Sequence, residues 1–293
     1  MRRQKLNFKQ ELKLPSSIDE FSFRGDSFYI KRDDTIHSKF SGNKARKLYY
    51  YLQKDFPKIK KIISYGSNQS NAMYSMSELA KIKNWKFDYF VDHIPTYLKE
   101  NPQGNYLRAL ENGMNMSIKD DKEISLDNNT LFIEEGARGK EAEYGIEILA
   151  KEIIGWKENN NIKNLKIFLP SGTGTTALYL QKHLKYKVYT TPCVGDEEYL
   201  KKQFSMLERN TKYHPIILNT EKKYHFGKLY RGFYDIYKEL KNNGIEFDLL
   251  YDPKGWIIVS SYPDIFTETT LYIHQGGLIG NESMLARYER KYN

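Results

Sequence analysis

The sequence predicts an α/β fold built from consecutive strand–helix units. Short apolar runs alternate with amphipathic stretches along the chain, and this alternation is typical of stacked βα units. The 293 residues are enough to bury one large core or two smaller ones. The hydrophobic content of 40% lies within the globular range and agrees with a folded, soluble protein.

Strands are predicted where apolar and β-branched residues form short runs: Phe28–Lys31, Lys61–Tyr65, Phe87–Val91, Met114–Ile118, Leu131–Ile133, Ile167–Leu169, Lys187–Thr190, Ile216–Leu218 and Leu271–Ile273. Helices are predicted where apolar residues recur at helical spacing: Lys44–Lys54, Asn71–Ile82, Asn105–Glu111, Glu141–Lys157, Thr175–Leu184, Glu197–Arg209 and Leu229–Asn242. The stretch Trp256–Ser260 is ambiguous, although its β-branched residues favour a strand. No internal repeat or low-complexity linker divides the chain.

A lysine lies at the start of one predicted helix, directly after a Gly-Asn turn. The segment 41–48 reads Ser-Gly-Asn-Lys-Ala-Arg-Lys-Leu, and Ala45, Leu48 and Leu52 follow at helical spacing. The positive end of the helix dipole disfavours an ammonium at Lys44 and lowers its pKa. A deprotonated lysine can form a Schiff base with an aldehyde. The alternative is that Lys44 is one more solvated cation in a lysine-rich chain.

A glycine-rich loop has the composition of a phosphate-binding site. It reads Ser171-Gly172-Thr173-Gly174-Thr175-Thr176 and joins a predicted strand to a predicted helix. Backbone N–H groups freed by the glycines, the hydroxyls and the positive end of the following helix can converge on an anion. The lysine of a nucleoside triphosphate loop and the third glycine of a dinucleotide motif are absent. A small monophosphate therefore fits better, and the alternative is an ordinary turn without a ligand.

A Schiff-base lysine and a separate monophosphate loop together suggest pyridoxal phosphate, whose aldehyde and phosphate need these two partners. The sequence also resembles the 1-aminocyclopropane-1-carboxylate (ACC) deaminase / D-cysteine desulfhydrase family over roughly residues 28 to 280. The segments 41–48, 64–71, 171–176, 248–255 and 272–277 carry this resemblance and occur in the family's order. Their G-N-K-x-R-K-L and Q-S-N motifs are specific in combination, whereas the other motifs are individually weak.

The resemblance implies a two-domain fold type II of the pyridoxal-phosphate enzymes, similar to the tryptophan synthase β-subunit, with open, mostly parallel sheets flanked by helices. Residues 1–50 and 150–293 are expected to form the larger, cofactor-binding domain, and residues 51–149 a smaller inserted α/β domain. The active site is expected between the domains, the usual place for a ligand in such enzymes. The resemblance also implies a helix at Trp256–Ser260 and a homodimer.

The resemblance gives roles to the residues around the cofactor. Lys44 would hold pyridoxal phosphate and later act as the base at Cα, while the loop 171–176 would hold the phosphate. Asn71 matches the asparagine that binds the cofactor's phenolic oxygen, and Ser70 matches the serine beside the substrate. Gln69, Ser70 and Asn71 belong to a polar run that can hold a substrate carboxylate at a helix start. The same run also suits an N-cap.

A second group of matched residues lies in the C-terminal half. Tyr251 and Asp252 match a Tyr-Glu pair of ACC deaminase, in which the acid faces the pyridine nitrogen and the tyrosine lies over the substrate. A carboxylate at Asp252 would keep that nitrogen protonated and strengthen the electron sink. The alternative is a simple turn, because Tyr-Asp-Pro-Lys-Gly is strong turn chemistry. Gln275 would border the substrate or the cofactor ring, whereas His274 is expected to be structural.

Some residues depart from the family pattern. Ala72 stands where the family commonly has His or Gln, and the following Met73 and Tyr74 are bulkier and less polar than usual. A second tyrosine of ACC deaminase falls near Phe226, which replaces it unless Tyr224 shifts into its place. These changes leave cofactor binding intact but put the substrate in question.

Composition excludes several other classes of protein. The net charge of +9 is dispersed among acidic residues, and no basic arm or RNA-binding signature concentrates it. No apolar run approaches the roughly 18 residues of a membrane span, and no apolar stretch follows the basic N-terminus as in a secretory signal. The single cysteine, Cys193, excludes an internal disulfide and a multi-cysteine zinc site. We therefore expect a cytoplasmic protein without nucleic acid, membrane or metal.

The predicted function is a pyridoxal-phosphate enzyme of the D-cysteine desulfhydrase kind. It would remove the Cα proton of a small amino acid and eliminate the β-substituent, giving a 2-oxo acid and ammonia. One alternative is ACC deaminase, and a second is a non-catalytic homologue that binds a phosphorylated metabolite.

Overall fold

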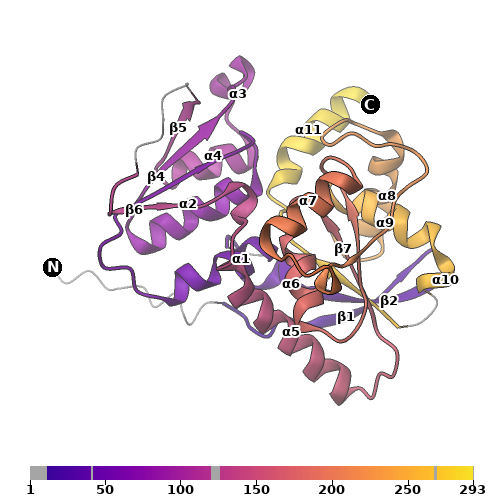
Figure 1. Ribbon diagram of the computed structural model, residues 1–293. Helices are drawn as coiled ribbons and strands as arrows, with labels where there is room; N and C mark the ends of the chain where they lie inside the picture. The colour runs from indigo at the N-terminus through magenta and orange to yellow at the C-terminus, as the bar shows by residue number, and fades with distance from the viewer. Residues whose placement is uncertain (1–11, 41, 120–125, 267–268, 293) are drawn as a thin grey trace.

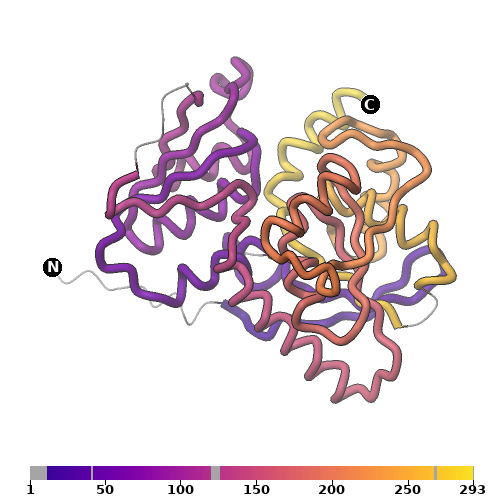
Figure 2. The backbone as a smooth tube through the Cα atoms, viewed as in Figure 1, coloured from indigo at the N-terminus to yellow at the C-terminus, as the bar shows by residue number. Residues whose placement is uncertain are grey.

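The protein contains two β-sheets that lie side by side, each with helices packed around it (Figures 1 and 2). The computed structural model describes residues 12–40, 42–119, 126–266 and 269–292. Among these residues, no helix combines the length and the apolar character that crossing a membrane requires.

The larger sheet has six strands in the order β1-β2-β10-β7-β8-β9. All neighbours are parallel except the hairpin of β1 and β2. Because β10 pairs with both β2 and β7, the last strand of the chain joins its first strands to its middle. The strands are β1 (Ile18–Phe23), β2 (Asp26–Arg32), β7 (Lys166–Ser171), β8 (Val188–Pro192), β9 (Ile216–Ile217) and β10 (Thr270–His274).

The smaller sheet has four parallel strands in the order β5-β4-β3-β6. They are β3 (Lys61–Tyr65), β4 (Lys86–Val91), β5 (Met114–Ile118) and β6 (Thr130–Phe132). The helices of the chain are α1 (Gly42–Gln53), α2 (Asn71–Lys83), α3 (Thr96–Glu100), α4 (Gly104–Glu111), α5 (Ala142–Asn159), α6 (Thr175–His183), α7 (Glu197–Leu207), α8 (Arg231–Asn242), α9 (Asp252–Ser261), α10 (Pro263–Phe266) and α11 (Gly280–Tyr292). Short 3-10 turns are η2 (Asp33–Thr35), η3 (Glu135–Ala137) and η4 (Thr211–Tyr213).

The predicted alternation of strands and helices is confirmed, with each predicted segment overlapping an element of its own type. The ambiguous stretch Trp256–Ser260 lies inside helix α9, where Trp256 is fully buried and stacks on Tyr272 with ring centroids 4.6 Å apart. Tertiary packing therefore outweighs the β propensity of its branched residues.

Strand β1 and the helices α3, α10 and α11 are absent from the sequence-based prediction. Strand β1 depends on its hairpin with β2, which turns through Arg24 and Gly25, both with positive φ, so that Phe23 pairs with Asp26. Two central residues with positive φ are typical of the tight turn that joins twisted strands. The Arg-Gly pair is a weaker signal for such a turn than Asn-Gly.

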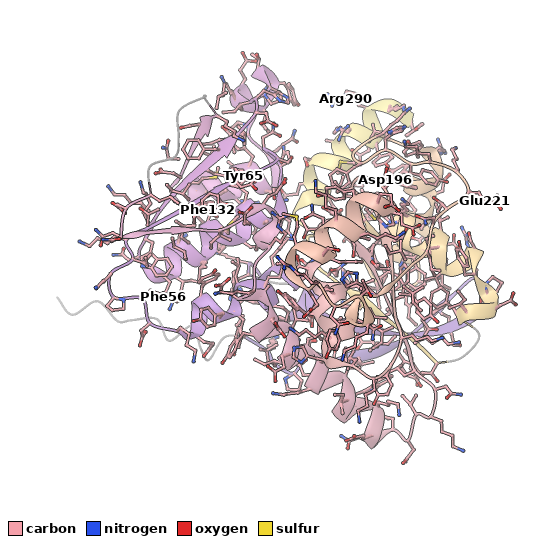
Figure 3. All side chains as sticks on the ribbon, viewed as in Figure 1. Phe56, Tyr65, Phe132, Asp196, Glu221 and Arg290 are labelled. Carbon is pink, nitrogen blue, oxygen red and sulfur yellow. The ribbon has the colours of Figure 1, made fainter. Side chains whose placement is uncertain are left out.

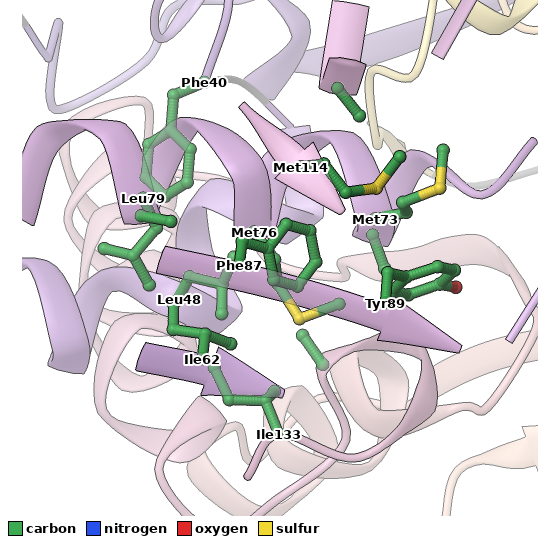
Figure 4. Close-up of a cluster of buried hydrophobic side chains, with 14 of the residues drawn as sticks. Phe40, Leu48, Ile62, Met73, Met76, Leu79, Phe87, Tyr89, Met114 and Ile133 are labelled. Carbon is green, nitrogen blue, oxygen red and sulfur yellow. The ribbon is translucent and has the colours of Figure 1, made fainter. Parts of the chain in front are cut away.

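Helix α1 packs into the core of the smaller sheet. Leu48 contributes to the apolar cluster shown in Figure 4, together with Ile62 from β3, Met76 from α2 and Phe87 from β4. On another side α1 touches α5 closely, because a Cβ atom on Gly145 would lie 2.0 Å from the carbonyl oxygen of Arg46. The domain division at residues 51 and 149 stays a prediction, and α1 packs against elements from both sides of it.

A buried network of charges fixes the first turns of α1. The Arg46 guanidinium binds both oxygens of Asp33, at 2.7 and 3.0 Å, and both oxygens of Glu152, at 2.7 and 2.8 Å. Lys31 adds an ion pair of 2.7 Å to Glu152. Arg46, Asp33 and Lys31 are at most 2% exposed, so each charge needs its partners.

We expect Arg46→Met to lower the free energy of unfolding by about 3–5 kcal/mol, because buried Asp33 would lose its guanidinium partner and Glu152 one of its two cationic partners. Urea denaturation measures this change. Arg24→Met is the matched control, since Arg24 makes a similar bidentate pair with Glu239 at the surface. Its loss should cost no more than about 1 kcal/mol. Equal losses in the two variants would contradict the importance of the buried network.

Candidate functional site

Two lysines of α1 meet at one backbone carbonyl. Lys44 Nζ lies 3.3 Å from the carbonyl oxygen of Gly136, and Lys47 Nζ lies 3.1 Å from the same atom. Lys47 Nζ also contacts Thr173 Oγ1 in the glycine-rich loop, at 3.4 Å. The structure thus brings the predicted Schiff-base lysine and the predicted phosphate loop together, through a lysine that the sequence analysis did not select. Ser41, at the start of the Gly-Asn-Lys motif, lies outside the described residues.

Both lysines are poor cations in this setting. Burial lowers the pKa of Lys44 to about 8, against a smaller opposing effect of its contact with Lys47. Burial and the neighbouring charge of Lys44 hold the pKa of Lys47 well below its ordinary value. The pKa of Lys44 is thus lowered, as expected from its place at a helix start, and the main cause is the loss of water around the amine. Neither amine forms an ion pair with a carboxylate of the described residues.

The glycine-rich loop runs from the end of β7 into α6 and holds its hydroxyls in different ways. Ser171 Oγ is bonded to Thr190 Oγ1 at 2.7 Å, and Thr173 Oγ1 lies 3.0 Å from Thr175 Oγ1. Thr176 Oγ1 is buried without a hydrogen-bond partner, which is costly unless a ligand provides one. Together with Lys47, this orphaned hydroxyl fits a phosphate at the start of α6.

Glycine is required at position 174 for packing rather than for access to an anion. Its φ is +68°, and a Cβ atom there would lie 2.6 Å from Leu200 Cδ1 on α7. The ring of Phe204 lies closer still. At Gly172 a Cβ atom would instead lie 3.4 Å from the Tyr251 ring, inside the candidate site. Gly172 is therefore the position where a side chain would disturb the site with less effect on α7.

The polar run before α2 serves partly as a helix cap. Ser70 Oγ accepts hydrogen bonds from the N–H groups of Ala72 at 3.1 Å and Met73 at 3.4 Å. Gln69 Oε1 is buried without a partner, so one polar atom of this run remains available to a ligand. Asn71 Nδ2 lies 3.2 Å from the position of a Cβ atom on Gly277, and only glycine there leaves room for the amide.

Tyr251 lies against Phe226 rather than against Tyr224. The rings of Tyr251 and Phe226 are 5.3 Å apart, whereas Tyr224 packs on Tyr230 and Phe233 at 5.0 and 4.8 Å. Tyr224 therefore does not move into the place of the second family tyrosine. The carbonyl of Tyr251 also faces Cys193, whose Sγ lies 3.7 Å away in the interior.

Asp252 is one of two adjacent buried carboxyls. Its oxygens accept hydrogen bonds from the Tyr272 hydroxyl at 2.7 Å and from the Asp248 N–H at 3.1 Å. Burial, and then the charge of Asp248, raise the pKa of Asp252 well above its ordinary value. Burial raises the pKa of Asp248 to about 6, although the N–H groups of Leu250 and Tyr251 bind its Oδ1. Two negative charges on this pair at once are therefore unfavourable.

The amide of Gln275 is engaged within the protein. Its Oε1 accepts from Asn43 Nδ2 at 2.9 Å, and its Nε2 donates to the Pro170 carbonyl at 2.6 Å. A substrate contact would have to replace one of these bonds. His274 has both ring nitrogens satisfied, by the Glu246 carbonyl at 2.7 Å and the Gly276 N–H at 3.1 Å, which fits a structural histidine.

The sequence analysis did not select two ionisable groups of the site, Lys47 and Asp248. Lys47 could have been found, because it follows Lys44 by three residues and therefore lies on the same helix face. Asp248 precedes the Tyr-Asp-Pro turn and caps its N–H groups, a pattern common to Asp in turns of every kind. Its closeness to Asp252 depends on the fold of that turn.

Comparison with solved structures identifies the fold. The sequence matches no family profile and no curated protein. An ACC deaminase homologue superposes with a TM-score of 0.80 over 99% of both chains, at 19% identity. A hydrogen sulfide-producing enzyme from Fusobacterium nucleatum matches with a TM-score of 0.64 at 13% identity, over 90% of this chain and 96% of that one. The processed form of a threonine deaminase from Solanum lycopersicum matches with a TM-score of 0.59 at 13% identity, over 90% and 78%. The resemblance to ACC deaminase is thus confirmed at the level of fold, and the chain has the tryptophan synthase β-like fold type II.

Proposed function

We propose that this protein is a pyridoxal-phosphate enzyme that eliminates the β-substituent of a small amino acid, giving a 2-oxo acid and ammonia. The observation that carries the proposal is the meeting of Lys44, Lys47 and the glycine-rich loop around the Gly136 carbonyl. An anion would stabilise the charged forms of these two poorly hydrated amines, and a phosphate held by the loop would provide it. The fold of the neighbours, which include two deaminating or sulfide-releasing enzymes by name, supports the same chemistry.

Different residues of the site would hold the cofactor, transfer protons and bind the substrate. Pyridoxal phosphate, when bound, supplies an aldehyde for a lysine and a ring that accepts electrons. Lys44, with its pKa near 8, can give up its ammonium proton near neutral pH and later hold the proton taken from Cα. Lys47 would regain its charge beside the phosphate, together with Thr173 and the N–H groups at the start of α6. The polar run 69–71 would hold the substrate carboxylate and Asn71 the phenolic oxygen of the cofactor.

For the acid beside the ring nitrogen we propose a charge that differs from the one expected from the sequence. The sequence analysis assigns Asp252 to this position as a carboxylate. Burial raises the pKa of both Asp252 and Asp248, and the charge of Asp248 raises that of Asp252 further, which disfavours two negative charges at once. We therefore propose that the two carboxyls carry one negative charge between them, and that a protonated ring nitrogen would draw it toward Asp252.

The surroundings of Tyr251 favour β-elimination over ring opening of ACC. ACC has no Cα–H, so its ring must be opened by specialised groups. Phe226, which packs on Tyr251, lacks the hydroxyl of the second family tyrosine. Asp252 is one methylene shorter than Glu, and a misplacement of about 1 Å can cost on the order of a hundredfold in rate. D-Cysteine elimination needs mainly a base at Cα and an electron sink, so we propose D-cysteine as the better substrate.

Lys44→Ala should abolish the covalent lysine–pyridoxal adduct and lower turnover by at least roughly 10²–10⁴-fold, because the variant lacks its base. Borohydride reduction followed by peptide mapping locates the adduct. Lys47→Ala is the matched control, since it removes the neighbouring amine and should weaken cofactor binding while the adduct stays on Lys44. A reduced adduct on Lys47 of the Lys44→Ala variant would show that the two roles are reversed.

Gly172→Val should lower the affinity for pyridoxal phosphate, because a branched side chain would press on Tyr251 and cover the loop. Equilibrium dialysis with pyridoxal phosphate measures the loss. Gly155→Val is the comparison, since a Cβ atom on that glycine of α5 meets nothing within 4 Å. Unchanged occupancy in Gly172→Val would indicate that the loop is only a turn.

The protein should release pyruvate and sulfide from D-cysteine faster than it releases 2-oxobutyrate from ACC. Both 2-oxo acids are measured with the same purified protein at the same pH. A rate with ACC equal to or above that with D-cysteine would overturn the substrate preference and leave the cofactor proposal standing. A protein that binds pyridoxal phosphate but turns over no amino acid would instead be the non-catalytic homologue.

A further inference from the structure

Glu135 lies beside the carbonyl that holds the two lysines. It begins turn η3, and the next residue, Gly136, provides the oxygen 3.3 Å from Lys44 Nζ. The side chain of Glu135 extends over Gly66 at the end of β3, because a Cβ atom on Gly66 would lie 2.9 Å from Glu135 Oε1. Gly66 leads directly into the polar run before α2. The carboxyl group therefore lies next to the segment proposed to hold the substrate, and the following residue contacts Lys44.

Groups from several elements face this carboxyl. Lys44 and Arg138 attract its charge, whereas Asp92 and Glu134 repel it. The charge of Glu135 also contributes to the raised pKa of four tyrosine hydroxyls. They come from β3, β4, α7 and the start of α9: Tyr65, Tyr89, Tyr199 and Tyr251. Glu135 thus stands where these elements come together around Lys44.

The carboxyl group of Glu135 has no hydrogen bond or ion pair with the described residues, in contrast to that of its neighbour. Glu134 Oε2 accepts from the Tyr65 hydroxyl at 2.7 Å and from Arg138 at 3.1 Å. Tyr65 is itself stacked on Phe132, with ring centroids 6.0 Å apart (Figure 3). Glu134 is therefore a fixed structural group. Glu135 is exposed to solvent and free to meet a ligand.

We propose that Glu135 is the general acid that protonates the leaving group of the substrate, a role that rests on the proposed β-elimination. The electron pair of the Cα–H bond becomes the second bond between Cα and Cβ, while its proton passes to Lys44. The bond from Cβ to sulfur or oxygen breaks with its electron pair on the leaving atom. That atom takes the proton of the Glu135 carboxyl and departs as hydrogen sulfide or water. Solvent then returns a proton to the exposed carboxylate.

The protonation of Glu135 agrees with this role. Partial loss of water around the carboxyl, and the nearby charge of Asp92, raise its pKa, and only Arg138 and Lys44 oppose the shift. A raised pKa keeps more of the acid protonated near neutral pH, as general-acid catalysis requires. Turnover that depends on Glu135 should fall as the pH rises through its pKa.

The test compares leaving groups that differ in their need for a proton. Purified holoenzyme is assayed with serine, cysteine and β-chloroalanine, each as the enantiomer that it turns over. Glu135→Gln should slow serine by roughly 10²–10⁴-fold, cysteine by less, and β-chloroalanine by less than about threefold, because chloride leaves without a proton. The fall of the serine rate at high pH should disappear in the variant. An equal loss on all three substrates, or no loss on serine, would overturn the proposal.

A measurement independent of turnover tests the placement of Glu135. In the full chain prepared without pyridoxal phosphate, competitive amine labelling over a pH series gives the pKa of Lys44. Glu135→Gln should lower that pKa, because the carboxylate stabilises the ammonium. Asp92→Asn removes a neighbouring carboxylate that acts on Glu135 and not on Lys44, and it should leave the pKa of Lys44 little changed. An unchanged pKa of Lys44 in Glu135→Gln would overturn the placement.

The two proposals fail in distinguishable ways. A wild-type protein that forms no lysine–pyridoxal adduct contradicts the cofactor proposal and, with it, the role of Glu135. A wild-type protein that eliminates chloride, thiol and hydroxyl groups, with rates that Glu135→Gln leaves unaltered, contradicts the general acid alone.

Discussion

The ion pairs of Arg46 hold together the parts of the chain that form the candidate site. Its guanidinium joins α1 to the turn after β2 through Asp33 and to α5 through Glu152. Each partner belongs to a different layer of the fold, and α1 also packs into the core of the smaller sheet. Because Arg46 stands between Lys44 and Lys47 in the sequence, these ion pairs also hold in place the part of α1 that carries both lysines. The position of the candidate site therefore depends on these interior ion pairs as well as on its loops.

Lys44 and Lys47 lie on the same helix as Arg46 but form no ion pair with a carboxylate of the described residues. Arg46 has two carboxylates, whereas Lys44 and Lys47 share one carbonyl oxygen and lose part of their charge. A folded protein that leaves amines buried without counter-ions sacrifices stability, unless a ligand supplies the missing charge. The contrast between neighbouring cations on one helix is the physical reason for placing an anion at this point.

The order of elements could be predicted from the sequence, but several contacts of the site could not. Alternating apolar runs show the parallel strands because buried strands have a strong local pattern. Strand β1 was missed because its stability comes from pairing with β2 across a turn of unusual composition. Lys44 and the loop 171–176 carry local motifs, whereas the engagement of Gln275 by Asn43 and Pro170 depends on residues more than 100 positions away. The raised pKa of Asp252 depends on burial, which no motif records.

The buried thiol of Cys193, which faces the backbone carbonyl of Tyr251, can report on local opening of the structure. Burial raises the pKa of Cys193 to about 12, so the thiolate that reacts with alkylating reagents is scarce in the closed structure. The sequence contains no other cysteine that could obscure the signal. The rate at which Cys193 is alkylated under native conditions thus measures how often the structure around this thiol opens. Any ligand that tightens this part of the structure would register as protection of a single sulfur atom.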